Sequence, residues 1–378
     1  MRNMLFDNNV LKSRQFDIPV IAVGNITVGG SGKTPHIEYL INLLHDRFKV
    51  AVLSRGYKRK TKGFLMATHR TTMQEIGDEP YQMLQKFPDV KVIVDADRCH
   101  AIDMIMTMPE TKDIEVVLLD DAYQHRYVKP GKNILLVDYH RIITDDVLLP
   151  AGRLREPVSG KNRADIVIVT KCPRKLNPME YRVLQRNLNL FPFQELFFSV
   201  IQYLPLAPIF VEAMAIRQPD FNLPVTDDTA KLPHVLLLTG IASPKQLVED
   251  LTPYCKGITP LQFGDHHGFT ASDAEAINFA YKMMEKPAIV VTTEKDAIRL
   301  VGLQGLSKSV RENLYYLPIK IKFMLDNEEK FNKSIINYVQ GNPRNSKMAQ
   351  GANALSATNG NNPGYGIGNS GRGYKPLY

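Results

Sequence analysis

Short apolar runs rich in β-branched residues recur along the first half of the sequence and constrain its fold most strongly. They lie at 19–23, 50–53, 90–94, 116–119, 134–137 and 166–169. Runs of this length without polar alternation suit strands that are buried on both faces, as in a parallel sheet. Between the first two runs, four apolar residues share one face of a helix: Ile37, Leu40, Ile41 and Leu44. Strand, helix and strand in this order predict an α/β fold, with a mostly parallel sheet and helices on both faces.

A second set of predicted elements begins after about residue 197. Strands are predicted at 235–238, 258–263, 289–291 and 315–323, and helices at 244–251 and 270–284. The start of the second helix is marked by Thr270 and Asp273, which have the spacing of a capping box. We therefore expect a first domain over residues 1–197 and a second, smaller α/β domain over residues 198–340.

The end of the chain, residues 341–378, differs in composition from the rest. It holds eight Gly, seven Asn and three Pro, with four cations and no acid. We expect a disordered tail, because such a segment buries too little apolar surface to offset the loss of chain entropy. The tail supplies +4 of the net charge of +8 (47 Lys+Arg against 39 Asp+Glu). The remaining body is only mildly basic, which argues against a nucleic-acid-binding protein.

Cysteine content and hydropathy exclude several other classes of protein. The three cysteines, Cys99, Cys172 and Cys255, form no even set and no close pair. A disulfide framework and a thiolate zinc site are therefore not expected. We expect the protein to reside in a reducing compartment. No stretch reaches the roughly 18–20 continuous apolar residues of a membrane-spanning helix. Charged residues interrupt positions 1–19, so this segment does not resemble a secretory signal.

The segment 27–34, Thr-Val-Gly-Gly-Ser-Gly-Lys-Thr, lies between the first predicted strand and the first predicted helix. This is the context of a P-loop, in which glycines let backbone N–H groups surround a triphosphate at a helix N-terminus. We expect Lys33 to reach the outer phosphates and the Thr34 hydroxyl to bind Mg²⁺. The strict pattern has Gly at the position of Thr27. The predicted phosphate-binding residues are Thr27, Val28, Gly29, Gly30, Ser31, Gly32, Lys33 and Thr34.

Two carboxylates, Asp120 and Asp121, follow the apolar run at 116–119. The carboxyl ends of parallel strands line the ligand crevice of an α/β sheet, so the pair would face a metal ion held by Thr34. An Asp pair that only caps the loop after the strand is the structural alternative. The P-loop favours the metal site, and together they indicate phosphoryl transfer or hydrolysis of a nucleoside triphosphate.

Seven segments occur in a characteristic order: VGNITVGGSGKTP (23–35), SRGYKRK (54–60), GDEP (77–80), DDAYQHR (120–126), LLPAGRLREP (148–157), FGDHHGF (263–269) and TTEKDA (292–297). Together they resemble the tetraacyldisaccharide 4′-kinase (lipid A 4′-kinase) family of Gram-negative bacteria. The resemblance covers about residues 3–325 and implies a P-loop NTPase-like fold. It also implies phosphate transfer from ATP·Mg²⁺ to the 4′-hydroxyl of a tetraacyldisaccharide 1-phosphate, which forms lipid IVA.

The resemblance also implies roles for individual residues. Asp78, in the GDEP segment, corresponds to the proposed catalytic base. His266, in the DHH segment, corresponds to its partner, and His267 is the alternative imidazole. Glu156 corresponds to a further acidic member of the metal site. Without the resemblance, Asp78 suits a turn and Glu156 suits a loop ion pair.

The sequence departs from the family at its start. Family members generally begin with an apolar helix that anchors them to the inner membrane, and this sequence begins near the end of that region. Either the true start lies upstream or the protein docks without an anchor. We expect a peripheral protein on the cytoplasmic face, with Arg2, Lys12, Arg14 and the cation-rich run 55–62 facing anionic lipid headgroups. No obligate protein partner is indicated.

A second departure is Ala122, where the family usually has Gly. The substitution costs stability only if this position needs a positive φ.

Two other functions fit a P-loop with an acidic pair. A soluble P-loop kinase would use a small polar acceptor such as a sugar or nucleoside. A regulatory NTPase would act through a partner that senses the γ-phosphate. In TTEKDA (292–297) the Asn of a guanine-reading motif is absent, which argues against a regulatory GTPase.

Overall fold

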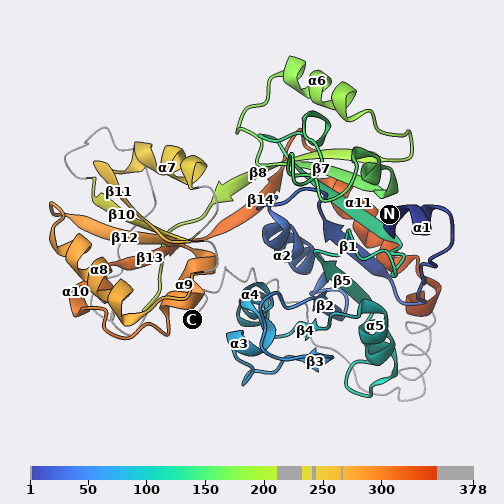
Figure 1. The fold of residues 1–378 in the computed structure, drawn as a ribbon, viewed down its shortest axis with the longest axis horizontal. Coiled ribbons are helices and arrows are strands. Elements are labelled where there is room, and N and C mark those ends of the chain that lie inside the picture. Colours follow the sequence, from blue (N-terminus) through green and yellow to red (C-terminus); the bar gives the residue numbers. More distant parts are fainter. Residues whose placement is uncertain (1, 211–231, 241–243, 265–266, 347–378) are drawn as a thin grey trace, which may run out of the picture. The chain divides into compact units, whose positions relative to one another are not determined.

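The computed structural model describes residues 2–210, 232–240, 244–264 and 267–346, which form two compact units (Figure 1). The first unit contains residues 2–201 together with 321–346. The second contains the described residues of 202–320. Among the described residues, no helix has both the length and the apolar character that crossing a bilayer requires.

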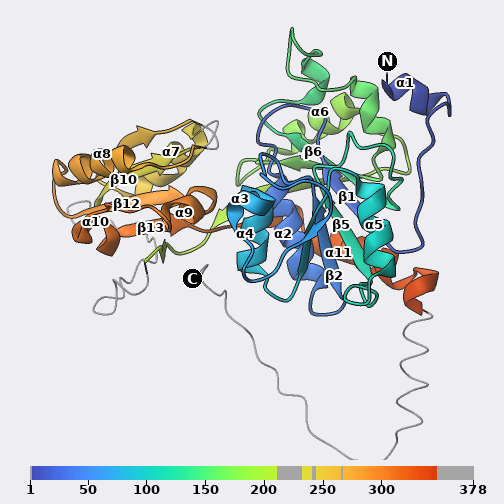
Figure 2. The same cartoon turned by 60° about the horizontal axis from the view of Figure 1, so that its bottom comes forward.

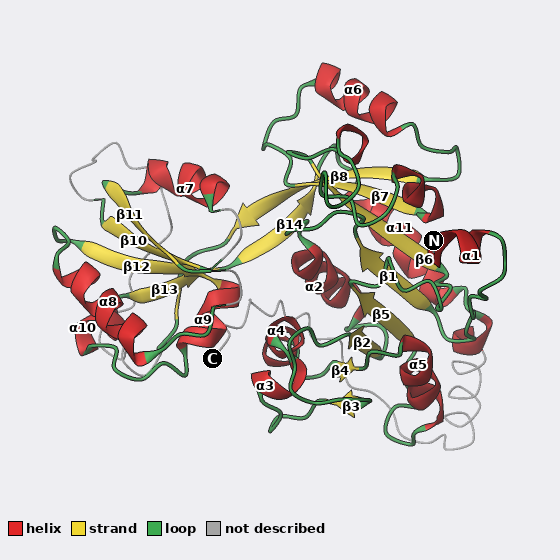
Figure 3. Cartoon of the chain, viewed as in Figure 1, coloured by secondary structure: helices red, strands yellow, loops and turns green. Residues whose placement is uncertain are grey.

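A nine-stranded, mostly parallel sheet forms the centre of the first unit (Figure 3). Its strands are β1 (Val20–Gly24), β2 (Val50–Ser54), β3 (Leu65–Met66), β4 (Lys91–Val94), β5 (Val116–Asp120), β6 (Lys132–Asp138), β7 (Ile166–Thr170), β8 (Glu195–Tyr203) and β14 (Ile319–Phe323). Their order is β14-β8-β7-β6-β1-β5-β2-β4-β3. Only β3 is paired antiparallel, to β4, among the pairs whose register is defined. The six runs predicted as buried strands are therefore confirmed.

Helices cover both faces of this sheet. They are α1 (Arg2–Asp7), α2 (Lys33–Leu44), α3 (Met73–Ile76), α4 (Asp78–Lys86), α5 (Arg98–Thr107), α6 (Pro178–Leu188) and α11 (Glu328–Gln340). Alternate residues of β1 enter different cores: Ile21 and Val23 pack with α2, α4 and α11, whereas Val20 and Ala22 pack with α5. The predicted apolar stripe of α2 is buried in the first of these cores. Two-sided burial explains why the strands lack polar alternation.

The second unit is built on a five-stranded sheet with the order β11-β10-β12-β13-β9. The strands are β9 (Ala207–Pro208), β10 (His234–Thr239), β11 (Gly257–Gln262), β12 (Ala288–Thr293) and β13 (Leu314–Leu317). The helices are α7 (Lys245–Leu251), α8 (Ala271–Lys282), α9 (Glu294–Leu300) and α10 (Lys308–Glu312). The capping box of Thr270 and Asp273 at the start of α8 is present.

The prediction that residues 198–340 form one domain is wrong for 321–340. The segment predicted as a single strand at 315–323 is divided at Pro318: β13 belongs to the second sheet, and β14 returns to the first, beside β8. Helix α11 then buries Phe331, Ile335 and Val339 in the core of the first unit. The second unit is therefore inserted within the chain of the first.

The expected disorder of the tail is also wrong for its first residues. Arg344 donates to the carbonyl oxygens of Ile114 (2.6 Å) and Lys112 (2.9 Å), and Asn345 is buried. These side chains satisfy backbone carbonyls just before β5, so residues 341–346 pack on the first unit. The remainder of the predicted tail, 347–378, lies outside the described residues.

Strand β1 occupies the position that determines where a ligand binds. It lies between β5 and β6, and the chain crosses to one side of β1 to form β2 and to the other side to form β6. A crevice opens at such a reversal, beyond the carboxyl ends of the strands. In the parallel ladder Val23 lies opposite Asp120, so the segments that follow β1 and β5 start side by side.

The return of the chain to the first unit predicts a stability effect. Phe331 is 1% exposed and its ring lies 5.3 Å from that of Phe197 and 4.3 Å from that of Phe323. Phe331→Ala should lower the free energy of unfolding by about 3–5 kcal/mol, because it leaves a cavity in this core. Urea denaturation would measure the change. In the control, Phe193→Ala, the side chain is 64% exposed, and a change above about 1 kcal/mol there would contradict the assignment.

Candidate active site

The P-loop connects β1 to α2, as predicted. Gly29 (φ 107°) and Gly32 (φ 84°) have left-handed backbone conformations that strain any residue with a side chain. Thr27 has no such φ and forms an antiparallel bridge with Leu154. Its side chain is therefore tolerated where the strict pattern has Gly. The positive φ after β5 belongs to Asp121 (46°), so Ala122 needs no glycine and is simply buried.

Buried side chains from the core of the first unit form hydrogen bonds with carbonyl groups of the P-loop. The ring of His36, which is 3% exposed, lies with Nδ1 2.7 Å from the carbonyl oxygen of Gly32 and Nε2 3.0 Å from the Ser199 hydroxyl. The Thr170 hydroxyl donates to the carbonyl oxygen of Ser31 at 3.0 Å. Nδ1 must carry the proton in order to donate to Gly32, and Nε2 then accepts from Ser199. Burial lowers the pKa of His36 to about 4, so the ring is neutral at pH 7.

Arg155 ties the P-loop to the segment after β5. Its guanidinium donates to the Thr27 carbonyl (3.0 Å) and to the side chain of Asn25. It also forms an ion pair with Asp121 at 3.3 Å. One planar guanidinium therefore fixes the loop and the second carboxylate relative to each other.

Lys33 and the acidic pair lie together at the start of α2. The ammonium of Lys33 is 3.7 Å from Oδ1 of Asp121. Asp120 is 1% exposed; its Oδ2 accepts from the Ser54 hydroxyl at 3.2 Å, and its buried Oδ1 has no hydrogen-bond partner among the residues that the structure describes. Burial raises the pKa of Asp120 well above its usual range, and the negative charges of Glu79 and Asp121 raise it further.

This donor set fits a divalent cation. Hard cations such as Mg²⁺ bind carboxylate, hydroxyl and phosphate oxygens. An unpartnered buried oxygen on Asp120 is costly unless a ligand binds it, and a nearby cation would favour the ionised form of the crowded pair. Thr34, directly after Lys33, supplies the hydroxyl that the sequence predicts as a further ligand.

The GDEP segment opens α4 close to the acidic pair. The helix begins at Asp78, after Gly77 with φ 92°. The influence of Glu79 on Asp120 places the first turn of α4 within electrostatic reach of the β5 carboxylates. A carboxylate in a first turn is favoured by the helix dipole, which acts against the repulsion from Asp120. Asp78 therefore starts a helix, where the residues alone suggested only a turn.

Glu156 is buried (3% exposed) and fully engaged by protein donors. Its oxygens accept from Asn3 (2.9 Å), Gln124 (3.1 Å) and Arg163 (2.8 Å). These contacts join α1, the segment after β5 and the segment before β7. In this arrangement Glu156 is a structural carboxylate, and its role as a metal ligand stays a prediction.

The DHH segment belongs to the second unit. His266 and Asp265 lie outside the described residues. The alternative imidazole, His267, has Nε2 2.9 Å from Oδ2 of Asp273 and stacks on Phe263. Its contact with Asp273 lowers the pKa of that carboxyl group. His267 is thus engaged at the start of α8, and the pairing of Asp78 with His266, or with His267 as the alternative, stays a prediction.

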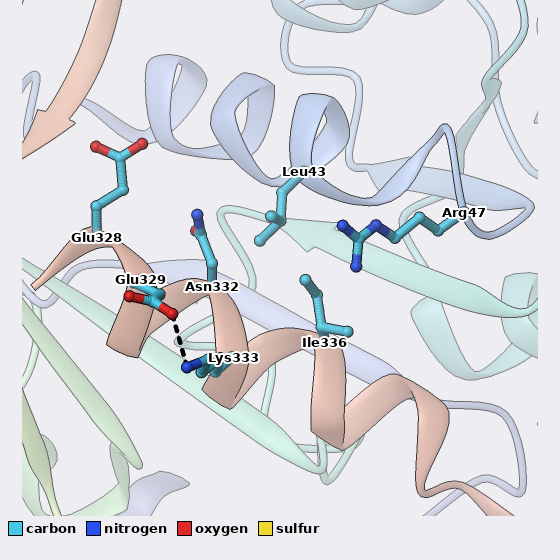
Figure 4. A pocket seen from close by; sticks show the side chains of 7 residues that line it. All are labelled: Leu43, Arg47, Glu328, Glu329, Asn332, Lys333 and Ile336. Carbon is cyan, nitrogen blue, oxygen red and sulfur yellow. Dashed lines mark ion pairs between the residues drawn. The ribbon is translucent and has the colours of Figure 1, made fainter. Parts of the chain in front are cut away.

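A shallow groove elsewhere on the first unit does not contribute to this site (Figure 4). It lies between α2 and α11, and its lining includes Leu43, Asn332 and the ion pair of Lys333 with Glu329 (2.7 Å). Leu43 is ten residues from Lys33 along α2, which corresponds to about 15 Å of helix. The groove is therefore remote from the P-loop.

Comparison with known proteins shows the family of the chain. The model of the LpxK family, tetraacyldisaccharide-1-P 4′-kinase, matches residues 1–340. The chain belongs to this family. Tetraacyldisaccharide 4′-kinase of Phocaeicola vulgatus is 52% identical over 92% of this chain and 93% of its own length. That of Bacteroides thetaiotaomicron is 50% identical over 94% of this chain and 93% of its own length.

A solved relative confirms the α/β, P-loop NTPase-like fold. The crystal structure of LpxK from Aquifex aeolicus in complex with ATP is 30% identical in sequence, with a TM-score of 0.63. The alignment covers 89% of this chain and 94% of that one. Family membership is thus supported by sequence and by fold.

The LpxK-family site also contains residues that sequence reasoning missed. Glu79 was not predicted as a site residue, although it is acidic and follows Asp78 in the same segment. Ser54 is the last residue of β2 and the first residue of the SRGYKRK segment. Its place at the carboxyl end of a strand was the signal that could have identified it as a site residue. His36 carried no signal, because a histidine on an apolar helix face gives no indication of a partner on β8.

Burial of His36 predicts a pH-dependent stability. The pKa is about 4 in the folded chain and about 6.5 in the unfolded chain, so the unfolded state binds the proton first as pH falls. Stability is therefore fully present above about pH 6.5 and declines toward pH 4. Between pH 7.5 and 4.5 the loss is on the order of 2–3 kcal/mol.

The variant His36→Asn keeps a donor for the Gly32 carbonyl but does not titrate. Its free energy of unfolding, measured by urea denaturation, should therefore converge toward that of the wild type as pH falls. The exposed His69→Asn is the matched control and should show no convergence. A gap between wild type and His36→Asn that is the same at pH 7.5 and 4.5 would contradict the neutral buried imidazole.

Proposed function

We propose that this chain transfers the γ-phosphate of ATP to the 4′-hydroxyl of a tetraacyldisaccharide 1-phosphate and so forms lipid IVA. The observation that carries the proposal is the meeting of Lys33, the Asp120–Asp121 pair and the start of α4 at the P-loop of an LpxK-family chain. Phosphoryl transfer requires mainly positioning and charge neutralisation, and this constellation offers both.

The P-loop and its neighbours would bind the triphosphate. Backbone N–H groups of the P-loop, other than those of Val28 and Ser31, would bind the phosphates, while His36 and Thr170 hold the carbonyls of Gly32 and Ser31. Lys33 would neutralise the outer phosphates. Mg²⁺, held by Thr34, Asp120 and Asp121, would supply charge neutralisation on the phosphate oxygens. Arg155 orients Asp121 for this task through their ion pair.

Asp78 would accept the proton of the attacking 4′-hydroxyl, and His266 would orient or polarise its carboxylate. The helix dipole at the start of α4 favours ionised Asp78, and an imidazolium beside it would favour the ionised form further.

The lipid acceptor implies work at a membrane surface, and we place the protein peripherally on the cytoplasmic face of the inner membrane. Four of the cations proposed for this contact are engaged within the protein. Arg14 pairs with Asp103, and Arg59 donates to the Gly63 carbonyl at 2.6 Å. Arg2 donates to the Gln124 carbonyl at 2.9 Å, and Lys60 donates to the Gln74 side chain at 2.8 Å. Lys12, Lys58 and Lys62 are exposed and would meet anionic headgroups, with each contributing about 1 kcal/mol.

Two substitutions test the assignment. With labelled ATP and tetraacyldisaccharide 1-phosphate, Lys33→Ala should lower kcat/KM by at least about 100-fold, because the outer phosphates lose their cation. Asp78→Asn should lower kcat by about 10²–10⁴ with little effect on ATP affinity, because only proton transfer is lost. The exposed Asp89→Asn is the control. If Asp78→Asn kept most of the rate while Lys33→Ala was inactive, the base would be wrong and the P-loop right.

The same assay separates the alternatives. Transfer that is indifferent to the acyl chains would indicate a soluble P-loop kinase. Nucleotide hydrolysis that is unaffected by the acceptor would indicate a regulatory NTPase.

A further inference from the structure

Helices α2 and α4 begin with two of the residues that the proposed reaction requires. Lys33 is the first residue of α2, and Asp78 is the first residue of α4. Both helices pack on the same core of the first unit, and Figure 2 shows them side by side, as does Figure 1. The distance from the proposed base to the outer phosphates therefore depends on how these two helices are fixed to each other.

A buried carboxylate on α2 connects the two helices. Glu38 is 4% exposed, and each of its oxygens accepts a hydrogen bond from α4. Oε1 accepts from the Gln82 amide at 2.8 Å, and Oε2 accepts from the Lys86 ammonium at 2.6 Å. We call these three buried side chains the interhelix contact. Because water is largely excluded from it, its charged hydrogen bonds are stronger than those on an exposed surface.

The geometry of the interhelix contact fixes α4 more precisely than apolar packing does. Met83 and Leu84 of α4 enter the core, but apolar contacts are non-directional. Gln82 and Lys86 lie about one turn apart on α4. Two hydrogen bonds from these positions to one carboxylate therefore define both the rotation of α4 and its position along its axis.

We propose that Glu38 is a positioning residue, which sets the place of Asp78 relative to the P-loop. The inference rests on the proposed function, since it takes Asp78 as the base. Gln82 follows Asp78 in the same helix at a distance of about 6 Å along the axis, so a shift of α4 at Gln82 is passed on to Asp78. A misplacement of about 1 Å can lower a rate about 100-fold, even when the substituted residue lies far from the chemistry.

The P-loop is held by other contacts. His36, Thr170 and Arg155 bind its carbonyl groups. A change in the interhelix contact should therefore lower kcat, because Asp78 is displaced, and leave the dissociation constant for ATP nearly unchanged. A residue needed only for folding would not separate these two quantities.

The first test removes the interhelix contact without leaving a buried charge. In the full chain, Glu38→Leu/Gln82→Leu/Lys86→Met introduces apolar side chains of similar volume, which often preserves stability at a buried ion pair. With tetraacyldisaccharide 1-phosphate as the acceptor, kcat should fall about 10–100-fold, while the urea midpoint and the dissociation constant for ATP stay near those of the wild type. The control Glu329→Gln/Lys333→Met removes an exposed ion pair within α11 and should leave kcat unchanged.

Two further variants separate positioning from stability. Glu38→Gln removes the negative charge that faces the Lys86 ammonium, so the chain should unfold at a lower urea concentration. The new amide can still accept from Lys86 and donate to a reoriented Gln82 amide, so kcat should stay within about threefold of the wild type. Gln82→Leu keeps the ion pair but removes one of the two hydrogen bonds, and it should lower kcat by about three- to tenfold.

The inference is overturned if the triple variant keeps the wild-type kcat, since apolar packing would then be enough to place Asp78. It is also overturned if kcat follows the urea midpoint across the variants, or if the affinity for ATP falls by the same factor as kcat. If the triple variant does not fold, an unchanged kcat in Gln82→Leu overturns the inference. A failure of the proposed function is distinguishable, because the wild type would then transfer no phosphate to the acceptor.

Discussion

The carbonyl groups of the P-loop determine how the rest of the site is arranged. A loop can direct its N–H groups toward phosphates only if its carbonyls bind elsewhere, and here His36, Thr170 and Arg155 provide that binding from three different elements. Two of these donors are buried, so solvent does not compete for them. The carbonyl side of the proposed nucleotide site is therefore anchored in the core of the sheet.

The two carboxylates of the acidic pair, Asp120 and Asp121, lie in different electrostatic environments. One oxygen of the buried Asp120 has no hydrogen-bond partner within the described part of the chain, whereas Asp121 is bound by Lys33 and Arg155. The proposed Mg²⁺ would therefore meet an unpaired oxygen on Asp120 and a carboxylate at Asp121 that two cationic side chains already orient. Glu79 raises the cost of leaving this cluster without a cation.

Local patterns predicted most of the fold and the places of the P-loop and of the acidic pair in it. Buried strands, the stripe of α2 and the capping box at Thr270 depend on residues close in sequence, and all are present. The P-loop and the carboxylates at the end of β5 were predicted because ligand-binding residues of a parallel sheet lie at the carboxyl ends of its strands. The return of β14 and α11 to the first unit was missed, since apolar patterns do not tell which sheet a strand joins. The partners of His36 and Glu156 were missed for the same reason, because they depend on tertiary contacts.

The inserted position of the second unit has a consequence for synthesis on the ribosome. Strand β8 is made more than a hundred residues before its neighbour β14, so the nascent first unit presents an open sheet edge while the inserted unit is still emerging. An unpaired edge is a template for pairing with other chains. Pairing of that edge in the native sheet therefore waits for β14, and we expect chains that stop within the insertion to be prone to aggregate.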